Sequence, residues 1–272
     1  MKRVYTVAII IAVSCSLIGG GLVYKKHVSD VAQAAAQQRT AAALKAKQQA
    51  AAAKLAAETA AAAAAVAFNK QQYSADAPDS IWVVANKQRP LQPKDYAPTD
   101  LVVPQIPLRL GKNSSEMQLR QAAATALESM TTAAEKAGVH LMLASAYRSY
   151  NLQVSVYGNE VKNYGQATAD SESARPGYSE HQTGLAADLE PVSHQCEIAD
   201  CFVTTPEGKW LVAHAGEFGF MQRYTIDKTA VTGYRAEAWH FRYVGIGLTT
   251  ELQKQGSTTL EEFFGLPAAP SY

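Results

Sequence analysis

The sequence has almost no net charge. Its 25 lysine and arginine residues face 24 aspartate and glutamate residues, which leaves a net charge of +1 at pH 7. A protein that binds nucleic acid through the phosphates carries a basic surplus, so this balance gives no electrostatic reason to expect a nucleic-acid partner. The hydrophobic fraction of 47% is ordinary, but one apolar run and one alanine-rich tract inflate it. The globular part of the chain therefore lies outside these two segments.

Charged residues are absent from residues 4–24, an apolar run of 21 residues that Lys2 and Arg3 precede. A helix of about 20 apolar residues is long enough to cross the bilayer core. We therefore predict that residues 1–28 form an N-terminal membrane anchor. The alternative is a cleavable signal peptide, which usually has a shorter apolar core. Cys15 could carry a lipid, but the three residues before it match a lipoprotein signal poorly.

Proline and glycine are absent from residues 29–72, which consist largely of alanine, glutamine and lysine. Alanine is the strongest helix former, so we predict a helical stalk over residues 29–77, with a helical part about 65 Å long at ~1.5 Å per residue. Leu44, Leu55 and Val66 recur every eleven residues, a spacing that can support a right-handed supercoil. A solvated stalk on a monomer is the simpler interpretation, and weak self-association is the alternative.

Proline marks the end of the stalk at Pro78, and residues 78–272 are predicted to form one domain. Residues 81–107 are interrupted by prolines and suggest a strand followed by a wrapping arm. The predicted helices cover residues 115–136, 152–164 and 206–218, and the predicted strands cover residues 139–146 and 233–243. Because helices mix with short, separated strands, the pattern indicates the α+β class rather than repeating β-α-β units.

Two short segments hold side chains that can bind a metal ion. His181 and Asp188 are seven residues apart, and the small Gly184 between them permits close backbone approach. Much later, Glu237 and His240 lie three residues apart, so one strand or turn could direct both into one cleft. Taken singly, each of these residues could equally be a core residue, a turn cap or an ion-pair partner.

Together the two segments supply what a hydrolytic zinc site needs. Three protein ligands, here His181, Asp188 and His240, leave a fourth position of the ion open for water. Zinc lowers the pKa of that water toward about 7. A carboxylate that is not a ligand can take the proton and return it to the leaving amine. Glu237 is the candidate for this base because it lies close to His240 in the sequence.

Three ordered motifs resemble those of VanY-type D-alanyl-D-alanine carboxypeptidases, which belong to the LAS group of zinc metallopeptidases. The motifs are residues 145–153 (SAYRSYNLQ), 179–188 (SEHQTGLAAD) and 237–245 (EAWHFRYVG). The resemblance extends over roughly residues 81–248. It implies a LAS/Hedgehog-type metallopeptidase fold, in which helices flank a small antiparallel sheet.

The resemblance also implies roles for the metal-site residues. His181, Asp188 and His240 fall on the positions of the ligands to one zinc ion, and Glu237 falls on the catalytic base. The sequence departs from the family at Ala238, where proline is common. This change frees the backbone locally but leaves all four metal-site positions filled.

Substrate-binding roles follow from the same motifs. Arg148 falls on the arginine that binds the terminal carboxylate or the developing oxyanion, which gives it both a substrate-binding and a catalytic role. Gln153 and Ser179 fall where the family contacts substrate, and Ser145 and Tyr147 are weaker candidates. From the residues alone, Arg148 could instead form a buried ion pair, and Gln153 could lie on an ordinary helix surface.

The implied function is a zinc D,D-carboxypeptidase that removes terminal D-alanine from stem pentapeptides of peptidoglycan. An L,D-carboxypeptidase on tetrapeptide stems would use the same residues, and a D,D-dipeptidase would need a more enclosed pocket. A non-catalytic wall-binding module that keeps zinc for structure is the alternative from another class of protein. It would have no use for Glu237 and Arg148.

The implied substrate lies outside the cytoplasm, so the chain is expected to be a single-pass protein of the cell membrane with an extracytoplasmic domain. In an oxidising compartment, Cys196 and Cys201 are expected to form a disulfide that closes a small loop. Two free thiols, or a structural zinc site that also uses His194, are the alternatives.

Overall fold

The computed structural model describes residues 37–45, 47–48, 68–256 and 259–272. The chain divides into two compact units, Met1–Ala67 and Phe68–Tyr272. In the first unit, the described residues are helical, in keeping with their alanine-rich composition. The predicted anchor at residues 1–28 lies outside the described residues. Within the described part of the chain, no helix combines the length and the apolar character that crossing a membrane requires.

The second unit is built on a four-stranded antiparallel sheet in the order β3-β4-β6-β5. Its strands are β3 Leu141–Ser145, β4 Ala186–Pro191, β5 Phe220–Tyr224 and β6 Glu237–Tyr243. A second small sheet pairs β1 (Leu101–Val102) with β2 (Leu119–Arg120) in antiparallel fashion. The unit therefore has the predicted α+β class with small antiparallel sheets.

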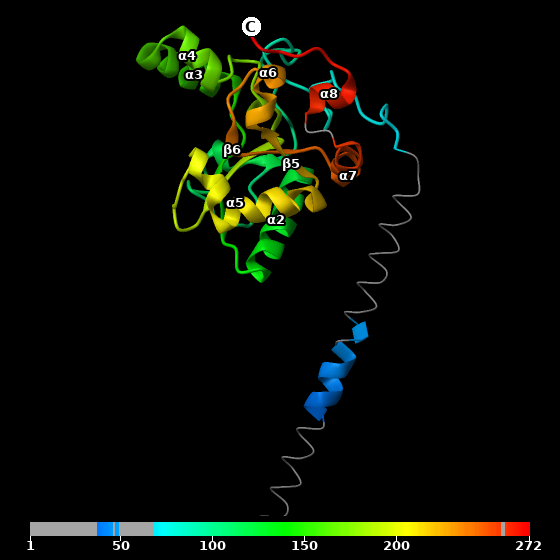
Figure 1. Ribbon diagram of the computed structural model, residues 1–272. Coiled ribbons are helices and arrows are strands. Elements are labelled where there is room, and N and C mark those ends of the chain that lie inside the picture. The colour runs from blue at the N-terminus through cyan, green and yellow to red at the C-terminus, as the bar shows by residue number, and fades with distance from the viewer. Residues whose placement is uncertain (1–36, 46, 49–67, 257–258) are drawn as a thin grey trace, which may run out of the picture. The chain divides into compact units, whose positions relative to one another are not determined.

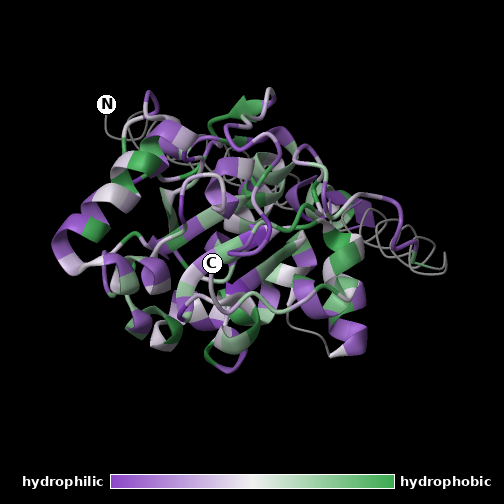
Figure 2. Ribbon diagram, turned by 90° about the horizontal axis from the view of Figure 1, so that it is seen from above, coloured by the Kyte–Doolittle hydropathy of each residue, from purple (hydrophilic) through white to green (hydrophobic). Residues whose placement is uncertain are grey.

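Helices flank the larger sheet (Figure 1). They are α2 Gln121–Lys136, α3 Tyr150–Tyr164, α4 Gln166–Glu172, α5 Pro206–His214, α6 Thr229–Thr232, α7 Ile246–Gln255 and α8 Leu260–Phe264. Helix α2 contacts β3, and α5 contacts β4. Hydrophobic and hydrophilic residues alternate along the helical ribbons in Figure 2, as expected for helices that bury one face.

The predicted helix over residues 115–136 begins later than expected. Ser115–Met117 form a 3₁₀ turn that the Ser114 side chain caps, and β2 follows before α2 starts. The predicted strand over residues 233–243 also starts late, because Gly233 adopts φ 82° and ends α6. In both cases the apolar pattern predicted the correct type of element but not its first residue. Strand pairing of β2 delays the start of α2, and the left-handed Gly233 delays the start of β6.

The compact unit begins at Phe68, whereas the sequence suggested a boundary at residue 78. The Phe68 ring stacks on Trp82, with centroids 5.3 Å apart, and meets Phe263 edge-on. These contacts extend a small apolar cluster that includes Val244 and Leu248. Because aromatic rings bury a large apolar area, these contacts make Phe68 part of the compact unit.

Cys196 and Cys201 form a disulfide, as expected. Both sulfurs are thereby used, so the alternative of a structural zinc site with His194 is wrong. The same loop leads into Asp200–Thr204, a 3₁₀ turn on which the start of α5 packs.

Replacement of Gly208 by alanine is expected to destabilise the domain by about 1–3 kcal/mol, as overpacking of a filled site does. Gly208 lies in the first turn of α5, where its N–H donates to the Thr205 side chain. A Cβ atom there would come within 2.1 Å of the Phe202 carbonyl oxygen, which is backbone and cannot rotate away. Thermal and urea unfolding of the variant would measure the loss.

Gly158 offers the matched control for this substitution. It is an exposed residue within α3, and a Cβ atom there meets nothing within 4 Å. Alanine at this position should leave stability unchanged or raise it by about 0.5–1 kcal/mol through helix propensity. Equal unfolding midpoints for the two variants would contradict the close packing at Gly208.

Candidate metal centre and active site

The central pair of strands brings two distant parts of the sequence together. In the register of β4 and β6, Asp188 is the direct partner of His240. The 3₁₀ turn Glu180–Thr183 precedes β4 and carries His181 to the same place. Cβ atoms of direct antiparallel partners lie about 4.5–5.5 Å apart, so the ladder itself sets the spacing of Asp188 and His240.

An irregularity in β6 turns Glu237 toward His240. Residues three apart on a regular strand point to opposite faces of the sheet. Here Gln222 pairs with Phe241 but Tyr224 pairs with Glu237, so β6 accommodates extra residues opposite β5. Bulges of this kind re-aim side chains beside active sites. As a result, Glu237 Oε2 lies 3.5 Å from His240 Nδ1.

The distances among the three predicted ligands suit one small cation. His181 Nε2 lies 3.3 Å from Asp188 Oδ2, and His240 Nδ1 lies 3.2 Å from Asp188 Oδ1. One ligand atom from each of the three residues lies within 4.8 Å of the other two. Two imidazoles and a carboxylate are a common set of zinc ligands, and they leave one position of the ion open.

Two of these atoms are buried without a hydrogen bond. Among the described residues, Asp188 Oδ1 and His240 Nδ1 have no partner that meets hydrogen-bond geometry, although they face each other. Buried polar atoms are normally satisfied, and an unsatisfied one carries a desolvation cost of about 1–3 kcal/mol. A metal ion bound between them would satisfy both atoms, so the residues present fit zinc.

Hydrogen bonding fixes the ring of His181. Its Nδ1 lies 2.6 Å from the carbonyl oxygen of Ala146, which can only accept, so Nδ1 carries the proton. The unprotonated Nε2 is then the nitrogen that faces Asp188. Such a bond from the second ring nitrogen orients a metal-binding histidine and sets its tautomer.

Burial shapes the protonation of the site. It raises the pKa of Glu237 to about 7, against the opposing charge of His240, which suits a base that exchanges protons near neutrality. It lowers the pKa of His181 and so favours the neutral imidazole that binds metal. For His240, burial also acts to lower the pKa, but the nearby carboxylates of Asp188, Glu180 and Glu237 outweigh it and raise the pKa to about 10. A metal ion therefore competes with a proton for this ring.

The Arg148 guanidinium is held by neutral groups. Its Nη1 donates to Gln153 Oε1 and its Nη2 donates to Ser145 Oγ, each at 3.2 Å. Its Nε is buried and has no partner, and no carboxylate pairs with Arg148 among the described residues. The Gln153 amide donates in turn to the Ala174 carbonyl oxygen, which keeps Oε1 directed at Arg148. The alternative of a buried ion pair is therefore wrong for Arg148, and Gln153 is buried rather than on the helix surface.

The remaining predicted substrate residues, Tyr147 and Ser179, are close in the sequence to Arg148 and His181, respectively. Tyr147 lines a cavity of about 390 Å³. The other lining residues are Asp95, Ala97, Ser149, Tyr150 and Asn151. Ser179 is buried just before the turn that carries His181, and its hydroxyl makes no hydrogen bond within the described residues. Trp239 is buried in the main core.

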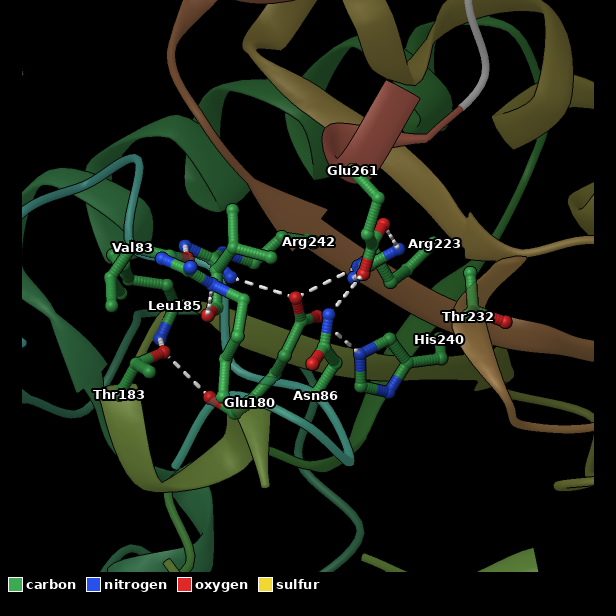
Figure 3. Close-up of polar contacts among 12 residues, drawn as sticks. Val83, Asn86, Glu180, Thr183, Leu185, Arg223, Thr232, His240, Arg242 and Glu261 are labelled. Atoms are coloured by element: carbon green, nitrogen blue, oxygen red, sulfur yellow. Dashed lines mark hydrogen bonds and ion pairs between the residues drawn. The ribbon is translucent and has the colours of Figure 1, made fainter. Parts of the chain in front are cut away.

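Sequence reasoning missed Glu180. This carboxylate is fully buried and accepts hydrogen bonds from Arg223 Nε and Arg242 Nη1, both at 2.8 Å (Figure 3). Its other oxygen lies 3.3 Å from Nε2 of His240. Both arginines therefore pair with acids. In the sequence, the only indication of a role for Glu180 is that it precedes the predicted ligand His181, and this position does not predict a contact with His240.

Comparison with known proteins identifies the family of this chain. The model of the family described as "VanY: D-alanyl-D-alanine carboxypeptidase" matches residues 116–246. The protein of Bacillus subtilis named "Putative carboxypeptidase YodJ" is 40% identical over 187 residues, which cover 69% of this chain and 68% of that protein. The chain belongs to the VanY family. A D-alanyl-D-alanine carboxypeptidase of Enterococcus faecalis is 34% identical over 66% of this chain and 64% of its own length.

Solved structures give the same family. The LdcB LD-carboxypeptidase superposes with a TM-score of 0.66 at 40% identity, over 69% of this chain and 87% of that one. A mutant of the D,D-pentapeptidase VanY, solved in complex with Zn(II), superposes with a TM-score of 0.54 at 29% identity, over 66% of this chain and 97% of that one. The structures similar to this chain therefore include one described as an LD-carboxypeptidase and one described as a D,D-pentapeptidase, and the latter was solved with Zn(II).

Proposed function

We propose that this member of the VanY family is a zinc-dependent carboxypeptidase that removes a terminal D-alanine from peptidoglycan stem peptides. The observation that carries the proposal is the Arg148 guanidinium, which has no carboxylate partner within the described residues and retains an unsatisfied, buried Nε. Arg148 is partly buried, and a partly desolvated guanidinium without a counter-ion favours a ligand that supplies the negative charge. The free carboxylate of a peptide supplies that charge.

The chain's own residues divide the work of hydrolysis. Zinc held by His181, Asp188 and His240 would polarise the scissile carbonyl and acidify the attacking water. Glu237 takes the proton of that water and returns it to the leaving amine, for which a pKa of about 7 is well placed. Arg148 donates to the terminal carboxylate and so fixes the position of the peptide. Ser145 accepts a hydrogen bond from the same guanidinium and so restrains the orientation of Arg148.

Two candidates remain for the residue that precedes the scissile bond. The sequence motifs suggest a D,D-carboxypeptidase that acts on pentapeptides, in line with the relative from Enterococcus faecalis. The higher identity to the LdcB LD-carboxypeptidase favours an L,D-carboxypeptidase that acts on tetrapeptides. Both remove D-alanine with the same catalytic residues, so the difference concerns only the binding of the preceding residue.

The N-terminal part of the chain suggests where this activity operates. An apolar run at residues 4–24 and an alanine-rich tract at residues 29–72 would tether the domain to the outer face of the cell membrane. In that position, the active site would face the wall peptides. The chain would act there as a monomer.

A panel of four peptides tests the proposed function. The full-length protein with zinc is incubated with stem tetrapeptide and pentapeptide, each as the free acid and as the C-terminal amide. We expect release of D-alanine from at least one free acid, and kcat/KM about 10- to 100-fold lower for its amide, because the amide forfeits a charge-assisted hydrogen bond. Mass spectrometry of the products identifies the preferred stem.

Arg148→Met provides the control for this panel. If Arg148 binds the terminal carboxylate, the variant should lose most of its preference for the free acid over the amide. An unmodified protein that hydrolyses acid and amide equally well would contradict carboxylate recognition. Absence of turnover on all four peptides would contradict the proposed function.

A further inference from the structure

The two predicted histidine ligands present different ring nitrogens to the metal centre. His181 faces Asp188 with Nε2 and uses Nδ1 for the carbonyl oxygen of Ala146. His240 faces Asp188 and Glu237 with Nδ1. Its Nε2 points the other way, to Glu180 Oε2 at 3.3 Å. Each histidine thus has its own acceptor on the side away from the centre, and for His240 that acceptor is a charged carboxylate.

We infer that Glu180 is a positioning residue for the metal centre, which holds His240 in the Nε2–H tautomer so that the Nδ1 lone pair faces the ion. The inference deepens the proposed function and rests on its zinc site. Imidazole has one proton to share between two nitrogens, so an acceptor at Nε2 determines that Nδ1 is free to bind metal. A carboxylate acceptor also makes the ring a stronger electron donor.

Glu180 is suited to this role because burial and hydrogen bonds hold its side chain in place. Its side chain is fully buried, and its Oε1 accepts from both Arg223 Nε and Arg242 Nη1 at 2.8 Å. Arg242 is anchored further by donating to the carbonyl oxygens of Ile81 and Val83. With one oxygen fixed by two guanidinium groups, the other oxygen is held at one place beside the His240 ring (Figure 3).

The same network balances the buried charge. Arg223 also donates to both oxygens of Glu261, at 3.0 and 2.7 Å, and Glu261 accepts from the Asn86 amide at 2.8 Å. Two guanidinium groups therefore face two carboxylates, Glu180 and Glu261, and none of these side chains is exposed. Glu180 contacts the metal-site residue His240, whereas the side-chain partners of Glu261 among the described residues are Arg223 and Asn86.

This difference provides a matched pair of variants, Glu180→Gln and Glu261→Gln. Each removes one negative charge from the same buried network, and both should lower the melting temperature of the full-length protein. The zinc dissociation constant, measured by competition with a chromophoric chelator, should separate them. We expect zinc binding to weaken about 10- to 100-fold in Glu180→Gln and to stay within about threefold of the unmodified protein in Glu261→Gln. Equal weakening in both variants, or unchanged affinity in Glu180→Gln, would overturn the inference.

A second measurement needs no variant and applies even if Glu180→Gln fails to fold. Long-range ¹H–¹⁵N correlation spectra of the zinc-loaded, histidine-labelled protein report which ring nitrogen carries the proton. We expect the proton of His240 on Nε2 and that of His181 on Nδ1. A proton on Nδ1 of His240 would overturn the inference while leaving the zinc site intact. Failure of the unmodified protein to bind zinc would instead overturn the site itself.

Discussion

Glu237→Gln is expected to lower kcat about 10²–10⁴-fold, the usual contribution of a positioned general base. Glutamine has nearly the same size as glutamate but cannot take a proton from the attacking water. The Glu237 carboxylate lies 3.5 Å from His240 and is close to the metal centre without being one of its three ligands. The loss should therefore appear in turnover, and zinc content should stay at one ion per chain.

The control for this variant is Glu217→Gln, which changes a glutamate whose side chain is 62% exposed and pairs with His214 on the surface. It should retain full activity. Undiminished turnover of Glu237→Gln would reject Glu237 as the base. If the unmodified protein also showed no turnover on any stem peptide, the non-catalytic wall-binding module would be the better interpretation.

His181→Ala is expected to remove bound zinc and to reduce activity by a factor of about 10³ or more, because hydrolysis by this chemistry depends on metal-activated water. The variant deletes one of three ligands and leaves Asp188 and His240 to bind the ion alone. Metal analysis of the purified protein and the stem-peptide assay measure both effects. In the unmodified protein, a chelator should abolish the activity and added zinc should restore it.

His194→Ala is the matched control for the metal ligand. His194 lies in a second group of possible ligands with Glu190 and Glu197, but Arg109 already pairs with both of those carboxylates. Its side chain is 56% exposed, so its removal should leave one zinc per chain and full activity. If His194→Ala lost zinc and His181→Ala retained it, the metal would lie at Glu190, His194 and Glu197, which would contradict the proposed site.

Much of the fold could be predicted because its signals are local. Ser149 caps α3 through its own side chain, and Gly219 ends the helical segment from Pro206 in a left-handed conformation. Such caps depend on residues three or four positions apart, which a sequence displays directly. The start of α2 was misplaced because β2 forms only by pairing with β1, some 18 residues earlier in the chain.

For the site too, the sequence and the tertiary structure determine different features. By itself, the sequence determined which side chains could hold zinc and act as base, since His181, Asp188, Glu237 and His240 carry that chemistry wherever they lie. Only the tertiary structure decided that Asp188 and His240 are paired across two strands, and that an irregular β6 turns Glu237 to the same face.

The tertiary structure also assigned partners that no local pattern indicates. Within the part of the chain that the structure describes, Arg148 has no carboxylate partner. Glu180 is buried between Arg223 and Arg242, which lie 43 and 62 residues away in the chain. Register and burial arise from contacts between residues that are remote in sequence, and the energy of a buried charge depends on what surrounds it. The sequence therefore determined which functional side chains this site can use, and the fold determined their geometry and the balance of their charges.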